Sequence, residues 1–578
     1  MKTSLLEFIR ESNHSTTTYK LKRTKISQTI HFTCLICPAL IFSACSANHY
    51  RKSADKEVAA VIAQKTPAVP NMDTNFSIEA SEKMSFEKFP VSTKVEDFFG
   101  TEGDKEKGAH IISLENALDI AVKHSRTYQN RKELLYLQAL QLTLARHNFA
   151  PIFSGKGAGR LNNVQVTREG VDTITTENRF TALGSAGVEQ LLRIGGRLAA
   201  DFSTDFTRYI LGDPRATSSS LLVGRLSQPL LRGAGYKIAS ENLTQAERDL
   251  LYGLRDFTRS RKEFSVEIAS AYYGVLQNRD AVRNSWRGFQ NFKLNVERER
   301  AFTEEGLRPQ AALDQIKQAE LQTESRWINA VRVYRQSLDQ FKIQLSLSTD
   351  ANVVLEDQEL EQLKILHPTV SVDEAARVAL ASRLDLYNER DQAEDATRRI
   401  HVAANRLKSQ VDLVAAAGVD GKSGSGFPKP DFDRYNWSAG LDIDLPLDRK
   451  SERNSYRAAL IANERAQREL ELAIDNIKLQ INDGWRNLDQ AKRSFEISEI
   501  GVQLAERRVE EQQLRAELGR GTARDLVDTQ NDLINSKNER TTALVSHTVA
   551  RLRFWRDMGI LMIKENGQWE EISNAGKN

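Results

Sequence analysis

The three cysteines are the residues whose type and spacing first suggest chemistry. Cys34 and Cys37 form a C-x-x-C pair, a spacing found in redox and metal-binding motifs. The pair lies inside an apolar stretch, residues 30–44, that follows a short basic segment. A basic segment before an apolar stretch too short to span a bilayer is typical of an export signal. We therefore interpret both cysteines as apolar filler of a signal peptide, residues 1–44, which cleavage would remove.

The third cysteine, Cys45, directly follows Phe-Ser-Ala at residues 42–44. Small residues before a cysteine resemble the lipobox of bacterial lipoproteins, in which the cysteine is acylated and becomes the first residue of the mature chain. Leucine is usual where this chain has Phe42, and an ordinary signal or an unmodified membrane anchor is the alternative. The sequence predicts a lipidated Cys45 and a mature chain without disulfides.

The rest of the sequence shows no pattern typical of catalysis or metal binding. Its nine histidines have no ligand spacing, and no nucleophile elbow or paired-acid motif is present. Gly155, Gly157 and Gly159 alternate within a strand-like segment, which disfavours a phosphate loop. The net charge is only +3, with acidic and basic residues interleaved, so nothing points to nucleic acid. We expect no catalytic residue, metal or cofactor, and hence no enzyme.

Alternation of apolar and polar residues is the sharpest local signal in the chain. Between Tyr435 and Leu447 every odd position is apolar, and the even positions are mostly polar or small. Successive side chains of a strand point to opposite faces, so this predicts one apolar face and one wet face that includes Asp442 and Asp444. A second strand is expected before it, near residues 411–419. The strands expected in the first half lie near residues 152–168, 178–193, 197–210 and 218–230.

Two explanations fit such alternation. A half-buried sheet in a soluble protein alternates in this way, and so does a transmembrane barrel with an apolar outside and a polar lumen. The export signal favours the barrel. An open sheet edge is not viable in lipid, and six strands are too few to enclose a lumen. We therefore expect several copies of the chain to close one barrel together.

Long helices are expected after the strands in both halves. Between Arg449 and Leu518 there is no proline, which predicts one helix on the order of 100 Å long. Its apolar and small residues recur at alternating steps of four and three, the spacing of a coiled-coil seam. The matching helix of the first half is expected from about Ile238 to Ala301. The stripe comprises Leu470, Ile474, Ile477, Ile481, Gly484, Leu488, Ala491, Phe495, Ser498, Val502, Ala505 and Val509.

Each long helix is expected to end at a glycine-containing break, after which a second helix turns back. The returning helices are expected to end near Leu347 and Ile560. Each pair of helices therefore forms a hairpin with the break at its tip. The tip residues are Gly306, Leu307, Arg308 and Pro309 in the first hairpin and Gly519, Arg520, Gly521 and Thr522 in the second.

The same order of elements occurs twice along the chain. One helix with an N-capping serine is expected from Ser113 to about Phe149, and another from Ser371 to about Leu407. Such duplication indicates a structure assembled from repeats. The expected segments are a signal peptide (1–44), a lipid anchor and polar tether (45–110), a first repeat (111–348), a connection (349–370), a second repeat (371–562) and a loose C-terminal tail (563–578).

With this layout and its motifs, the chain resembles the TolC-like outer-membrane efflux proteins, or outer-membrane factors, over about residues 111–562. One motif is LSQPLLRG at residues 226–233, where a strand leads to a helix, with a looser counterpart, IDLPL, at 443–447. Another is GTARDLVDTQ at 521–530, which is similar to the family's second hairpin tip. Each motif alone is weak, and their order in both halves carries the resemblance.

The resemblance implies a mixed α+β fold: a trimeric transmembrane β-barrel, to which each chain gives a sector, continuing into a long α-helical coiled-coil tunnel across the periplasm. It implies a passive exit duct of a tripartite efflux or type I secretion system, lipid-anchored in a Gram-negative outer membrane. The partners would be two further copies, a periplasmic adaptor (membrane fusion) protein, an inner-membrane transporter and outer-membrane lipid. The family's usual barrel takes four strands per protomer, so the six expected here depart from it.

The resemblance also implies a gate at the hairpin tips, which would dock the adaptor. Asp525 and Asp528 match by spacing the carboxylates that ring the family's periplasmic entrance, where six in a trimer would favour cations. The alternative is that both are helix N-terminal acids favoured by the helix dipole.

The closing bonds of the family do not transfer directly. The family's latch arginine falls on Gly521 and its acid on Ala312, so Arg520, Arg524 and Asp314 are only nearby substitutes. A second class of protein, a lipid-anchored periplasmic coiled-coil adaptor or scaffold, would also have paired long helices. It would have a single hairpin and no strands with an apolar outer face.

Overall fold

The computed structural model describes residues 47–570 except 80–83, 88, 168–173, 212–215, 423, 425–428 and 519. The chain divides into two units, residues 1–57 and 58–578. Helix α2 (Ala47–Lys65) crosses the boundary, and all other described elements belong to the second unit. The predicted signal peptide lies outside the described residues, together with Cys34, Cys37 and Cys45.

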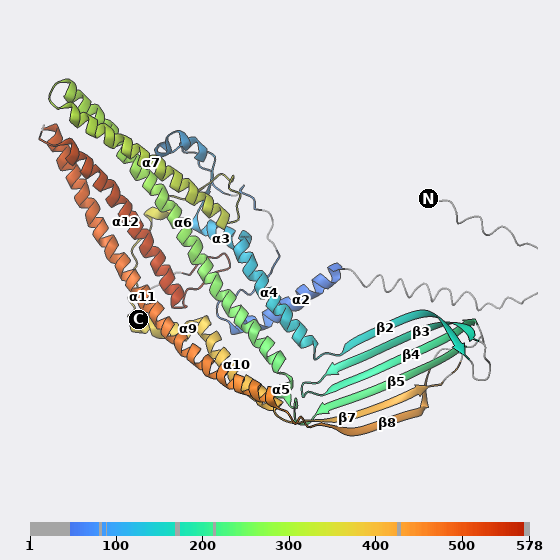
Figure 1. Ribbon diagram of the computed structural model, residues 1–578. Coiled ribbons are helices and arrows are strands. Elements are labelled where there is room, and N and C mark those ends of the chain that lie inside the picture. Colours follow the sequence, from blue (N-terminus) through green and yellow to red (C-terminus); the bar gives the residue numbers. More distant parts are fainter. Residues whose placement is uncertain are drawn as a thin grey trace, which may run out of the picture. The chain divides into compact units, whose positions relative to one another are not determined.

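Six antiparallel strands form one open sheet in the order β2-β3-β4-β5-β7-β8 (Figure 1). Four come from the first half and two from the second, as predicted, and they pair in sequence order. β2 and β8 are the two edges. The strands are β2 (Ile152–Thr167), β3 (Ile174–Leu191), β4 (Arg197–Leu211), β5 (Ala216–Pro229), β7 (Gln410–Gly421) and β8 (Pro430–Asp444).

The register of the sheet separates a polar from an apolar face, as the alternation predicts. On the polar face Asp442 lies opposite Asp412, and Asp444 lies opposite Gln410. Leu183 and Leu221 fall on the polar face, opposite Asp205 and Ser203. Residues directly opposite each other share a face, and most large apolar side chains of the six strands lie on the apolar face. Its exposed large apolar side chains are Phe153, Leu161, Phe180, Leu198, Ile210, Leu413, Tyr435, Trp437, Leu441 and Ile443.

Two helical hairpins follow the strands (Figure 1). The first pairs α6 (Glu241–Glu304) with α7 (Gln310–Gln344), after the short helix α5 (Tyr236–Ala239). The second pairs α11 (Lys450–Glu517) with α12 (Ala523–Asp557). The 68 residues of α11 form one continuous helix, which confirms the prediction, and every member of its predicted stripe is buried or half-buried.

The helix that precedes the strands in each half is divided in two, which corrects the prediction of single helices. α3 (Leu114–His124) and α4 (Arg126–His147) are separated by Ser125, and α9 (Val372–Ser382) and α10 (Leu384–Arg406) by Arg383. Both break residues have extended backbone, with ψ of 126° and 123°. Neither proline nor glycine marks the breaks, so the sequence gives no local signal for them.

Both predicted N-caps are present in the structure. The hydroxyl of Ser113 accepts a hydrogen bond from the backbone N–H of Asn116, and that of Ser371 accepts one from Glu374. These bonds satisfy backbone donors that the first turn of a helix leaves unpaired.

The described residues between 58 and 110 are part of the folded body, so the prediction of a free polar tether is wrong for them. They include the short helices η1 (Thr66–Ala68) and η2 (Asp97–Glu106). Val58, Ile62 and Phe99 are buried in the main core. β1 (His110–Ile112) then pairs in parallel with β6 (Val353–Leu355), just before α8 (Gln358–Glu361). Frequent charges and prolines hide these apolar anchors in the sequence.

A buried ionic network fixes η2 to the first hairpin. The carboxylate of Glu106 lies 3.1 Å from Arg279 of α6 and 3.4 Å from Arg335 of α7, and it accepts a hydrogen bond from the Tyr334 hydroxyl. Burial raises the pKa of Glu106, although the two guanidinium groups oppose the shift. Buried charges persist only when paired and hydrogen-bonded.

The C-terminal segment also differs from the predicted loose tail. Residues 563–570 form a turn in which Ile563 bridges to Trp569. The side chain of Asn71 holds this turn through two hydrogen bonds with the backbone of Ile563, each 2.9 Å long. Residues 571–578 lie outside the described part of the chain.

Candidate functional site

The described residues contain neither a metal cluster nor a membrane-spanning helix. No three His, Cys, Asp or Glu side chains of this part of the chain converge as a metal site would require. Among the same residues, no helix combines the length and the hydropathy that crossing a membrane demands. The predicted site residues, except Cys45, belong to the two hairpin tips.

The first tip is a tight turn between α6 and α7. Gly306 has a φ of +70°, a backbone conformation that favours glycine. Leu307 is 71% exposed at the outermost part of the turn. Pro309 is the N-cap of α7, with extended backbone, so it precedes the first helical residue.

The second tip runs from Leu518 to Thr522, and Gly519 within it lies outside the described residues. A Cβ on Gly521 would lie 3.0 Å from the backbone nitrogen of Ala516, so a side chain there would crowd the end of α11. Thr522 is the N-cap of α12: its hydroxyl accepts a hydrogen bond from the Asp525 N–H and donates one of 2.6 Å to the Asp525 carboxylate.

Apolar contacts join the two tips beneath these turns. Val296 of α6, Leu313 and Ile316 of α7, and Ala523 of α12 form one small buried cluster. The tips of the two hairpins of one chain are therefore packed together, and each turn rests on a shared apolar base.

Arg308 connects the first tip to the second. Its guanidinium donates a 2.6 Å hydrogen bond to the carbonyl of Gly521 and a 3.4 Å bond to the carbonyl of Ala516. The buried carboxylate of Glu299 lies 3.9 Å from the same guanidinium. Hydrogen bonds from a charged donor are stronger than neutral ones. Arg308 thus links the tips, a role that the sequence did not assign although it placed this residue at the tip.

The three predicted substitutes for the closing residues do not meet one another. Asp314 accepts a 3.1 Å hydrogen bond from Gln310, one turn earlier on α7. Arg524 lies 3.8 Å from Asp528 on α12, and Arg520 is exposed. Within one chain, the first hairpin supplies the arginines that contact the second near its tip: Arg308 binds carbonyl groups, and Arg298 lies 3.8 Å from Glu517 at the end of α11. The acids of the second tip, Asp525 and Asp528, are exposed.

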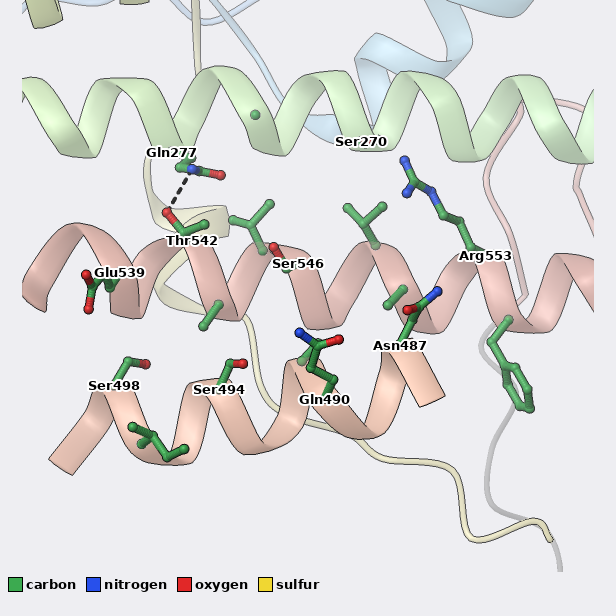
Figure 2. A pocket seen from close by; sticks show the side chains of 18 of the residues that line it. Ser270, Gln277, Asn487, Gln490, Ser494, Ser498, Glu539, Thr542, Ser546 and Arg553 are labelled. Atoms are coloured by element: carbon green, nitrogen blue, oxygen red, sulfur yellow. Dashed lines mark hydrogen bonds between the residues drawn. The ribbon is translucent and has the colours of Figure 1, made fainter. Parts of the chain in front are cut away.

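Away from the tips, a groove of about 1000 Å³ lies between α6, α11 and α12. Its lining combines hydroxyl and amide side chains with apolar ones such as Val545 and Val549, and Gln277 donates a 2.9 Å hydrogen bond to Thr542 across it (Figure 2). Of the described residues that line it, none is histidine or cysteine. The groove is thus a mixed polar and apolar surface, with charged side chains at Glu539, Arg553 and Asp557, and the described lining shows no histidine or cysteine that could work as a base or nucleophile. The lining residues that Figure 2 labels include Ser270, Asn487, Gln490, Ser494, Ser498 and Ser546.

Comparison with solved structures identifies the fold. The chain superposes on the outer membrane protein VceC of Vibrio cholerae with a TM-score of 0.56 at 15% identity, covering 77% of this chain and 96% of that one. The CmeC outer membrane channel of Campylobacter jejuni gives 0.56 at 11% identity, with 87% and 93% covered. The MtrE outer membrane channel of Neisseria gonorrhoeae gives 0.53 at 12% identity, with 85% and 98% covered.

Sequence comparison alone does not find these relationships. No family model and no curated protein matches the chain. The chain nevertheless has the fold of the TolC-like outer-membrane channels, as the resemblance of its motifs predicts. CmeC, MtrE and OprN, another of the structural neighbours, are outer-membrane channels and not enzymes.

Proposed function

We propose that the chain is the outer-membrane exit duct of a tripartite efflux or type I secretion system and works as a trimer. The observation that carries the proposal is one sheet with an exposed apolar face joined to two long helical hairpins, in the fold of known outer-membrane channels. Each half has two short helices, then strands, then a long hairpin, and this repeated order supports an internal duplication.

In this proposal the apolar face of the sheet contacts lipid and the polar face lines a water-filled lumen. Transmembrane strands alternate in this way, with aromatic residues near the interfaces. Asp442 and Asp444 lie on the polar face and would hydrate the lumen. A lipid on Cys45 would add a second attachment to the outer membrane, and substrates would pass without an energy source in the duct itself.

The helical hairpins would form the periplasmic tunnel, with their tips as the gate and the adaptor-docking surface. An inner-membrane transporter would deliver substrate through that adaptor. The exposed residue Leu307 and the turn at Gly521 and Thr522 offer the protruding surface. Asp525 and Asp528, repeated three times, would present six carboxylates at the entrance.

The adaptor or scaffold alternative predicts one hairpin and no strands with an apolar outer face. The structure has two hairpins and an exposed apolar sheet face, which favours the duct. Detergent extraction separates the two proposals: the Cys45→Ser variant of a duct still needs detergent to leave the membrane, whereas an adaptor without its lipid becomes extractable in buffer.

Planar-bilayer recording tests the duct directly. We expect the purified full chain to give discrete conductance steps, and the Asp525→Asn, Asp528→Asn double variant to lose cation preference and block by divalent ions. Asp483→Asn, which removes an exposed carboxylate from α11, is the matched control and should leave both unchanged. Folded protein that inserts without any conductance contradicts the duct, whereas an unaltered double variant contradicts only the gate.

A further inference from the structure

We infer that each protomer contributes all six strands to the barrel wall, so that three copies close an eighteen-stranded barrel by pairing β2 of one copy with β8 of the next. The inference rests on the proposed trimeric duct and deepens it. The family's usual four strands per protomer would give twelve. The additional strands are those of the first β-hairpin, β2 and β3. They lie either in the wall or outside it.

The hydrogen-bond register places every strand in the same wall. β2 pairs with β3 along the whole of its length, from Ile152 opposite Glu189 to Thr167 opposite Ile174. β3 pairs with β4 from Leu191 to Asn178, and β4 with β5 from Arg197 to Arg208. A hairpin that folded away from the wall would interrupt this ladder. Among the described residues of these three pairings, the only irregularity is one register shift, between Asn178 and Arg179, where the pairing of β3 with β4 ends.

The turn between β3 and β4 is anchored to the junction between sheet and helices. The carbonyl of Ile194 accepts hydrogen bonds from the Gly235 N–H, at 3.1 Å, and from the Gln228 side chain, at 3.4 Å. Gly195 has a φ of +97°, and a Cβ there would lie 2.6 Å from the carbonyl of Gly233. The additional strands therefore start at the same level as the strands that lead directly into helices.

The apolar face continues across the additional strands from Phe153 to Leu161, beyond which Asn163 lies opposite Asn178 on the same face. Phe153 of β2 and Trp437 of β8 lie in one row through Val188, Ala200, Gly224 and Ala417, which are successive register partners. Phe153 is 81% exposed and Trp437 is 73% exposed. A strand outside the membrane would gain nothing from such exposed apolar side chains, whereas a wall strand places them in lipid.

The two edge strands are suited to each other in length and direction. β2 has 16 residues and leads away from the helices, and β8 has 15 residues and returns to them. Pairing β2 with β8 of the next copy is therefore antiparallel, like every other pair in the sheet. Each copy offers one edge of each kind, so such pairing forms a closed ring.

The side chains of the edges are also complementary. On the polar face β2 carries Lys156 and Arg160, whereas the end of β8 carries Asp442 and Asp444. On the apolar face a Cβ added to Gly155 or Gly157 would meet nothing within 4 Å. A neighbouring aromatic side chain stabilises such edge glycines in a sheet, and β8 supplies Tyr435 and Trp437. Pairing of two β8 strands would instead bring acid against acid.

The larger wall changes where the duct selects its cargo. Barrel diameter grows roughly linearly with strand number, so eighteen strands give a barrel about 1.5 times as wide as twelve. Barrels of 16–18 strands leave an open aqueous channel. The helical tips, where Arg308 and Asp525 lie, are then the narrowest part of the route, and the sheet admits any cargo that has passed them.

Disulfide cross-linking in the full chain tests the wall. Each variant carries two cysteines. One is on β8, at Ser438 or at a polar-face neighbour two residues to either side. The other is Ser154→Cys on β2 or Ser203→Cys on β4. All of these side chains lie on the polar face, and β2 and β4 run in the same direction. If the hairpin of β2 and β3 lay outside the wall, β4 would be the edge that meets β8.

We expect covalent trimers for at least one β8 position with Ser154→Cys and none with Ser203→Cys, with the single-cysteine variants as controls. Trimers through Ser203→Cys, or a conducting trimer without any cross-link to β2, would overturn eighteen strands while leaving the duct intact. Covalent rings of two copies, or protein that neither trimerises nor conducts, would overturn the proposed function as well. Polyethylene glycols of increasing size, added on the outer side, test the width of the barrel. The size at which they no longer enter should be larger for this chain than for a twelve-stranded duct.

Discussion

The two helical hairpins have the same architecture and very different surroundings. α6 buries 28 of its 64 residues, because α3, α4, η2 and β6 cover it in addition to α7, α10 and α12. α11 buries only six of its 68 residues and contacts α9, α10 and α12. α6 is thus enclosed by its own chain, while α11 is largely bare, although its partner α12 buries 14 of its 35 residues. We call the first hairpin enclosed and the second bare after these two long helices.

This difference shows that equal repeats need not have equal roles. The bare helix exposes large apolar residues, among them Leu472 and Leu479, seven residues apart, and the group Ile497, Ile500 and Leu504. In the proposed trimer such a face would be covered by a neighbouring copy, since large exposed apolar patches mark interaction sites. The first hairpin then serves as the scaffold and the second as the part whose packing depends on assembly.

The largest expected effect comes from removing a buried charge in the enclosed region. Arg279→Met leaves Glu106 buried without its closest cation, and breaking a buried pair in this way costs about 3–5 kcal/mol. Arg486→Met is the matched change on the bare helix, where the guanidinium is 72% exposed and pairs only with Asp483. That control should cost no more than about 1 kcal/mol.

Thermal and denaturant unfolding in detergent measure both variants. Residues 97–106 should also exchange amide hydrogens faster in Arg279→Met than in the parent protein. Equal destabilisation by the two substitutions would remove the contrast between the enclosed and the bare hairpin.

The same contrast explains which features could be read from the sequence. The bare hairpin has its apolar stripe in a single helix, from Leu470 to Val509, and local periodicity was enough to predict it. The six strands were likewise predicted from alternation alone. The enclosure of the first hairpin depends on contacts between residues distant in sequence, such as Glu106 with Arg279. Local periodicity in the sequence does not predict such contacts. The Arg308 link was missed for that reason: its partners are backbone carbonyls of the other tip.

The pH dependence of stability should also differ between the hairpins, because the second hairpin holds an unpaired buried histidine. His547 of α12 is fully buried, and neither ring nitrogen has a hydrogen-bond partner among the described residues. Burial, together with the positive charges of Arg551 and Lys492 and the neighbouring His367, lowers the pKa of His547 to about 4. In the enclosed hairpin the buried Arg279 is instead paired with Glu106.

The sign of the effect follows from proton linkage. The unfolded chain binds a proton at His547 near pH 6.5, whereas the folded chain resists it until about pH 4. Stability from this group is complete above pH 6.5 and falls as the pH drops toward 4, by roughly 2 kcal/mol at pH 5. His547→Leu should therefore lose less thermal stability than the parent between pH 7 and 5. The exposed His401→Leu should behave as the parent does, and identical profiles for all three would contradict this role.

The smallest expected effect is local and concerns the contact between the hairpins. Arg308→Met removes the guanidinium that holds the carbonyls of Gly521 and Ala516, and hydrogen bonds from a charged group contribute about 1.5–3 kcal/mol. The apolar cluster beneath the tips remains, so the loss should loosen only the turn of the bare hairpin. Global unfolding should shift little.

Hydrogen exchange around residues 515–526 should therefore rise several-fold in Arg308→Met, and the exchange of α6 should stay unchanged. Arg520→Met, which removes an exposed arginine from the same tip, is the control and should leave the exchange as it is. In bilayers the loosened tip should spend more time open, which would raise the mean conductance. If exchange rises equally in both hairpins, the link is not a local latch, and the first hairpin is no more rigid a scaffold than the second.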